Sequence, residues 1–128
     1  MNALTPTKAI SAHAIAWFEI PVTDMARAKA FYNAVLETEL TDEDSGPNPM
    51  SMFPMKDKSS VSGHIYPGKP AAVGTGNTVH LAVADLEGAM ERVGRNGGTV
   101  VSPVITIPAG RFAYCVDPDG NSIGLFAA

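Results

Sequence analysis

The sequence is poor in charge and in cysteine, and it has no long apolar run. Charged residues make up 17% of the 128 residues and form no Lys/Arg run, which argues against nucleic acid as a partner. The single cysteine, Cys115, cannot close an internal disulfide and fits a reducing compartment. The most apolar stretch, residues 9–22, is interrupted by His13 and Glu19 and is too short to span a bilayer. With no secretory signal pattern at the N-terminus, we expect a cytoplasmic protein without a membrane partner.

What remains is an ordinary globular composition. Hydrophobic residues account for 45% of the chain, and the formal net charge is −4. A chain of this length buries about two-thirds of its unfolded surface as one domain. We therefore expect a single domain over residues 1–128.

Two stretches of the sequence match each other at a distance of 61 residues. Residues 17–26 and 78–87 each have the pattern of a strand that ends at an aspartate, Asp24 or Asp85 (85 − 24 = 61), and continues into a helix. A second echo links residues 62–65 to 123–126. The period predicts two similar modules, at about 13–66 and 77–126, joined by a Gly/Pro-rich linker at 67–76.

The predicted elements give each module a β-α-β-β-β order and the protein an α+β fold. The first helix starts at Met25 and ends near residues 37–40, and the second spans 86–95. Strands are expected at residues 13–22, 50–55, 60–66, 77–83, 99–101, 106–107, 112–116 and 122–126, with a weak one at 38–41. Residues 42–49 are expected to form a loop. One helix per sheet leaves the other face uncovered, so two such sheets can enclose a cleft for a small molecule.

Glu19 and His80 are the candidate catalytic residues. They occupy equivalent positions on the two opening strands (80 − 19 = 61), and an approximate two-fold axis would bring both towards one cavity. A carboxylate beside an imidazole can perform acid–base chemistry. The alternatives are a structural hydrogen-bonded pair or two residues that line the pocket without reacting.

The remaining candidates are ligand-binding residues. Trp17 and Thr78 share a strand face with Glu19 and His80, and Trp17 either stacks on a planar ligand or fills the cavity. Met52, Tyr114 and Arg111 complete the set, although methionine packing and a solvated loop arginine are the simpler readings. Since Tyr114 and Cys115 alternate, one of them faces the cavity, and Cys115 is expected in the core. His13 is expected to be solvated, and His64 to point away from the cavity unless the strand register differs by one residue.

The helix at residues 24–36 resembles the first helix of the vicinal oxygen chelate superfamily, and residues 97–100 and 110–126, with the Asp117-Pro118-Asp119-Gly120-Asn121 turn, are similar to its second half. The superfamily includes glyoxalase I, extradiol dioxygenases, methylmalonyl-CoA epimerase and bleomycin-resistance proteins. The resemblance covers about residues 13–126. It implies the glyoxalase/bleomycin resistance fold, an incomplete mixed-sheet barrel with a central cleft, and a homodimer.

The resemblance also implies four metal-ligand positions. In this sequence they fall on Trp17, Thr78, Gly124 and either Gly63 or, after a slip of one residue, His64. Because tryptophan and glycine offer no donor and threonine is a poor one, we expect no metal. The leading hypothesis is a glyoxalase/bleomycin-resistance-like protein that binds a small organic molecule in the cleft. The alternatives are a lyase, isomerase or dioxygenase that uses Zn, Ni, Fe or Mn, and a non-catalytic interaction module.

Overall fold

The computed structural model describes residues 13–44 and 46–128, which form two similar halves. The first half contains β1 (Trp17–Val22), α1 (Met25–Leu36), β2 (Thr41–Glu43), β3 (Met50–Met52) and β4 (Ser62–Pro67). The second contains β5 (Val79–Ala82), α2 (Leu86–Arg95), β6 (Thr99–Val100), β7 (Ile105–Ile107), β8 (Gly110–Val116) and β9 (Ser122–Ala127). The predicted α+β class is confirmed, and β7 corresponds to the strand expected at residues 106–107, which gives the second half one strand more than the β-α-β-β-β order.

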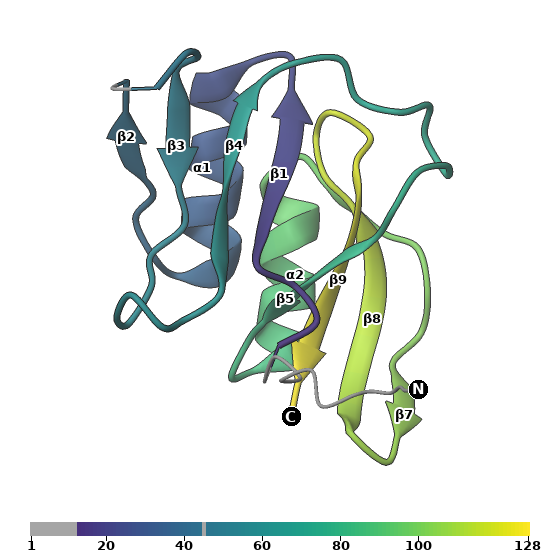
Figure 1. The fold of residues 1–128 in the computed structure, drawn as a ribbon. Coiled ribbons are helices and arrows are strands. Elements are labelled where there is room, and N and C mark those ends of the chain that lie inside the picture. The colour runs from purple at the N-terminus through teal and green to yellow at the C-terminus, as the bar shows by residue number, and fades with distance from the viewer. Residues whose placement is uncertain (1–12, 45) are drawn as a thin grey trace, which may run out of the picture.

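Each half builds one mixed sheet with its opening strand beside its closing strand. The first sheet has the order β1-β4-β3-β2, with β1 parallel to β4. The second has the order β5-β9-β8-β6, with β5 parallel to β9 and β7 also paired to β8. Figure 1 shows both helices behind the two sheets, so the front faces of both sheets are left uncovered. The sheets are therefore open, as expected for an incomplete barrel.

The helices begin at the two repeated aspartates and pack on the sheets through short apolar faces. Asp24 Oδ1 accepts a hydrogen bond from the Arg27 N–H at 3.0 Å, and Asp85 Oδ1 accepts from the Gly88 N–H at 3.1 Å, so the two aspartates are the N-caps of the helices. The buried helical residues join the inward side chains of the strands in one core; they are Ala28, Phe31, Tyr32 and Val35 on α1 and Leu86, Ala89 and Val93 on α2.

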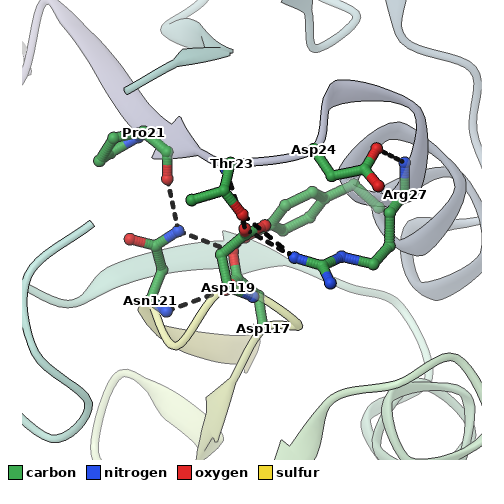
Figure 2. A network of polar contacts seen from close by, with 8 residues as sticks. Pro21, Thr23, Asp24, Arg27, Asp117, Asp119 and Asn121 are labelled. Carbon is green, nitrogen blue, oxygen red and sulfur yellow. Dashed lines mark hydrogen bonds and ion pairs between the residues drawn. The ribbon is translucent and has the colours of Figure 1, made fainter. Parts of the chain in front are cut away.

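The turn between β8 and β9 holds the second half against the first. Asp117 shapes this turn, because its Oδ1 accepts from the backbone N–H groups of Asp119 and Asn121, both at 2.9 Å. The Asn121 amide nitrogen donates to the Pro21 carbonyl at 2.8 Å (Figure 2). The buried hydroxyl of Tyr32 on α1 donates to Asp117 Oδ2 at 2.6 Å.

Asp119 adds an ion pair to this contact. Its side chain is fully buried, and its Oδ1 accepts from the Thr23 N–H at 2.9 Å and from the Thr23 hydroxyl. The same oxygen accepts from the Arg27 Nη2 at 2.8 Å (Figure 2). We call the contacts of residues 117–121 with the first half the inter-module clasp. Because it ties the β8–β9 turn to the β1–α1 junction, it fixes how the two opening strands lie relative to each other.

Several predicted boundaries differ from the structure. The expected weak strand at 38–41 lies at Thr41–Glu43 instead, because Asp42 accepts from the Lys29 ammonium at 3.0 Å and from the Ser51 hydroxyl of the neighbouring strand. This contact also places the start of the expected loop 42–49 in β2. The strand at Met50 ends at Met52 rather than at residue 55, and Pro67 closes β4 rather than opening the linker.

Candidate functional site

A cavity of about 1250 Å³ lies between the opening strands of the two halves. β1 contributes Trp17 and Glu19 to its wall, and β5 contributes His80, with Thr78 directly before this strand. The segments at 53–54, 61–62, 75–77 and 121–122 complete much of the remaining lining. The four residues predicted from the repeated strands therefore border one hollow. Trp17 is 39% exposed and Glu19 has a 63% exposed side chain, so both are accessible from the solvent.

His64 contacts both Trp17 and Glu19 of the cavity wall. The Trp17 indole Nε1 donates to His64 Nδ1 at 2.9 Å, and His64 Nε2 lies 3.2 Å from Glu19 Oε1. Because Nδ1 accepts a hydrogen bond, the proton of the neutral imidazole is on Nε2, which faces the carboxylate. With an exposure of only 7%, His64 is a buried anchor behind the Trp17 ring and the Glu19 carboxylate.

The 61-residue register, which pairs Gly63 with Gly124, is wrong, and the alternative of a one-residue shift holds because the closing strands lie 60 residues apart. His64 therefore shares a strand face with Trp17 and Glu19, although it is not among the described residues that line the cavity. Glu19 lies opposite His64 in the first sheet (64 − 19 = 45), whereas His80 lies opposite Gly124 in the second (124 − 80 = 44). His64 therefore occupies the position equivalent to Gly124, and Gly63 does not. The sequence holds a signal for this, since Ser62-x-x-Ile65 matches Ser122-x-x-Leu125 at a distance of 60 residues.

His80 lies among aromatic rings rather than beside Glu19. Its ring centroid is 5.2 Å from that of Phe112, 5.7 Å from that of Tyr114 and 6.1 Å from that of Phe126. The glycine opposite His80 makes this placement possible, because a Cβ on Gly124 would lie 2.1 Å from His80 Nδ1. Glu19 and His80 thus border the same cavity but have different partners, His64 for Glu19 and the aromatic rings for His80. Among residues 13–44 and 46–128, no hydrogen bond joins Glu19 to His80.

Three other predicted ligand-binding residues lie outside the wall of the cavity formed by the described residues. Met52 pairs with His64 across β3 and β4, and Tyr114 shares the open face of the second sheet with His80. Arg111 forms an ion pair with Glu87, and its hydrogen bonds lower the pKa of that carboxyl. The predicted ligand contact of Arg111 therefore competes with an existing partner.

The remaining sequence candidates have the expected environments. Thr78 lines the cavity, and its hydroxyl is 2.6 Å from the Ser122 hydroxyl. Cys115 is fully buried in the core, and burial raises the pKa of its thiol from 9.0 to about 11. His13 is exposed. The alternation of Tyr114 and Cys115 across β8 is confirmed.

The four positions implied for a metal do not fit a divalent ion. With the observed register they are Trp17, His64, Thr78 and Gly124, and His64 alone supplies an ordinary metal donor. Its Nδ1 already accepts from Trp17, and the Thr78 hydroxyl pairs with Ser122. Within the part of the chain that the structure describes, no group of three or more His, Cys, Asp or Glu residues could hold a metal ion.

Two similar open sheets that border one cavity define a class of proteins built from paired β-α-β-β-β modules. A comparison of the sequence with protein-family models identifies the family. Residues 14–125 match the family model of the Glyoxalase/Bleomycin resistance protein/Dioxygenase superfamily. The chain belongs to this superfamily. No helix in the described part is long and apolar enough to cross a membrane.

Comparison with individual proteins supports the same fold. The candidate glyoxylase CFP32 of Mycobacterium tuberculosis is 28% identical over 116 residues, which cover 88% of this chain but only 44% of that protein. A glyoxalase/bleomycin resistance protein from Albidiferax ferrireducens has a TM-score of 0.71 and 22% identity, covering 91% of this chain and 99% of its own. The antibiotic binding protein TnmS3 from Streptomyces sp. CB03234 has a TM-score of 0.65 and 24% identity, covering 93% and 98%.

Proposed function

We propose that this protein binds a small planar organic molecule in the cleft between its two halves, without the metal used by other superfamily members. The single observation that carries the proposal is the exposed face of Trp17 in the wall of the cavity of about 1250 Å³. A cavity of this size is large enough for a drug-sized ligand, and aromatic side chains commonly stack on planar groups. The similarity in fold to TnmS3, an antibiotic binding protein, supports a small organic ligand.

A thermal-shift screen with Trp17→Ala tests the binding proposal. Aromatic antibiotics, small carboxylates and thiol conjugates are added to the purified protein, and at least one aromatic compound is expected to raise its Tm. Trp17→Ala is expected to abolish that shift. Val101→Ala is the matched control, because Val101 is also an exposed apolar residue (57%) but does not line the cavity. A compound that stabilises the wild type and both variants equally contradicts the proposal.

The proposed absence of a metal distinguishes this function from the metal-dependent lyase, isomerase or dioxygenase. Its support is the donor chemistry of the four positions, of which only His64 suits a divalent ion. Metal analysis of the purified protein is expected to find no stoichiometric Zn, Ni, Fe or Mn. A stoichiometric ion that is lost on Glu19→Ala would overturn this part of the proposal.

We also propose a cytoplasmic homodimer. A second copy is supported by Tyr114, a large side chain that is 37% exposed on the open face of the second sheet. Sedimentation equilibrium is expected to give twice the chain mass of 13.4 kDa. A concentration-independent single-chain mass refutes the dimer without affecting the cleft.

A further inference from the structure

The charge of the cavity wall is one-sided. Among the described residues that line the hollow, Glu19 is the one that carries a fixed charge, and no lysine or arginine is present. The polar residues Thr78, Asn77 and Ser122 of the lining are neutral. Because partly enclosed walls of one sign concentrate ligands of the opposite sign, this wall favours cations over anions.

The Glu19 carboxylate lies beside the only tryptophan in the sequence. His64 contacts both residues, through Nδ1 to the Trp17 indole at 2.9 Å and through Nε2 to Glu19 Oε1 at 3.2 Å. Because the indole N–H of Trp17 donates to His64, the polar edge of the ring is already hydrogen-bonded, and the face of the ring remains available to a ligand. A ring face attracts positive charge through its quadrupole, and a carboxylate does so through its own charge.

We propose that the cleft selects planar aromatic ligands that carry a positively charged amine, with Trp17 and Glu19 as the contacting residues and His64 as the positioning residue for both. This inference rests on the proposed function and adds the charge of the ligand to it. The aromatic part stacks on the Trp17 ring, and the ammonium group lies within reach of the Glu19 carboxylate. Buried His64 prevents the two from turning away independently.

Three naphthalene derivatives of similar size test the charge preference. They are naphthalen-1-ylmethylammonium, naphthalen-1-ylmethanol and 1-naphthoate, and binding is followed by two-dimensional NMR on the ¹⁵N-labelled protein. One tryptophan gives one indole N–H resonance, so the Trp17 signal reports directly on the cleft. The ammonium is expected to bind about 10-fold more tightly than the alcohol. Of this preference, the Glu19 carboxylate is expected to contribute a factor of about 5 and the Trp17 ring face a factor of about 2. The naphthoate is expected to bind more weakly than the alcohol.

Glu19→Gln is expected to reduce the preference for the ammonium over the alcohol to about 2-fold. Glu91→Gln is the matched control, because it removes the same charge from an exposed residue on α2 that does not line the cavity. It is expected to keep the full preference. If Glu19→Gln also keeps it, or if all three compounds bind equally, the charge inference is overturned while binding in the cleft stands. If no compound moves the Trp17 resonance at millimolar concentration, the proposed function itself fails.

The positioning role of His64 has its own readout. His64→Leu removes the acceptor, so the Trp17 indole resonance is expected to shift in the absence of any ligand and the ammonium preference to fall. His64→Gln retains a side-chain acceptor and is expected to restore much of both. An unchanged indole resonance and an unchanged preference in His64→Leu would overturn the role of His64. A His64→Gln protein that folds but behaves like His64→Leu would do the same.

Discussion

Tyr32→Phe removes one buried hydrogen bond from the inter-module clasp while leaving the aromatic ring in place. Tyr32 is fully buried, and its hydroxyl donates to Asp117 Oδ2 at 2.6 Å. A hydrogen bond to a charged group contributes about 1.5–3 kcal/mol to stability. The Asp117 carboxylate keeps three other donors, from Asp119 and Asn121, so we expect a loss of about 2 kcal/mol, within the lower part of this range.

Thermal and urea unfolding measure this loss. For a chain of 128 residues, about 2 kcal/mol corresponds to a fall in Tm of about 6–10 °C. Tyr114→Phe is the matched control, because it makes the same chemical change on an exposed side chain and is expected to stay within about 0.5 kcal/mol of the wild type. Tyr32→Phe and Tyr114→Phe proteins of equal stability would refute the account of the clasp.

The pH dependence of the same variant gives an independent check. Burial, followed by the nearby Asp117 charge and hydrogen bond, raises the pKa of Tyr32 well above its ordinary value of 10.0. Above pH 10 the unfolded chain releases the tyrosine proton and the folded chain keeps it. The contribution of Tyr32 to stability is therefore complete below pH 10 and falls by about 1.4 kcal/mol per pH unit above it. The stability gap between the wild type and Tyr32→Phe should shrink above pH 10, and a constant gap contradicts the raised pKa.

Two further predictions concern glycine and cysteine. Gly94→Ala on α2, where an added Cβ meets no atom within 4 Å, is expected to stabilise the protein by about 0.5–1 kcal/mol, whereas Gly63→Ala should destabilise it because its Cβ would lie 2.3 Å from the Phe18 carbonyl oxygen. Urea unfolding that ranks the two variants the other way would contradict the packing. Cys115, with a pKa of about 11, is expected to resist a colourimetric thiol reagent at pH 8 until denaturant unfolds the chain, and rapid reaction of the native protein would show that the thiol is accessible.

The sequence was sufficient to predict the elements whose signals are local. Asp24 and Asp85 cap the helices because the capping oxygen reaches an N–H only three residues away. The bounds of α2, at Leu86–Arg95, agree with the prediction because the signals that start and end this helix are also local in the sequence. The alternation of β1 correctly predicts that Trp17 and Glu19 share one strand face, and in the structure both are solvent-accessible while Ile20 lies in the core. Local spacing therefore predicts the starts of both helices and the shared strand face of Trp17 and Glu19.

The contacts that the sequence did not predict depend on distant segments. His64 reaches Glu19 because β4 lies in a register that the 61-residue echo misplaces by one position. His80 lies among aromatic rings because Gly124 leaves space over the neighbouring strand. The turn at residues 117–121 was predicted from its sequence. The hydrogen bond that Asp119 in this turn accepts from the Thr23 N–H was not predicted, because it joins residues 96 positions apart. Such pairings arise from the packing of segments that are far apart in the sequence, which no local pattern specifies.

The unequal spacing of the two halves limits any attempt to rebuild the protein as a symmetric molecule. A chimera made from two copies of the second half would place glycine where His64 now stands and histidine where Glu19 now stands. Its hollow would have an aromatic environment around histidine on both sides and no acidic wall. The present contrast between Glu19 on one side of the cavity and His80, packed on aromatic rings, on the other therefore depends on differences between the halves in spacing as well as in side chains.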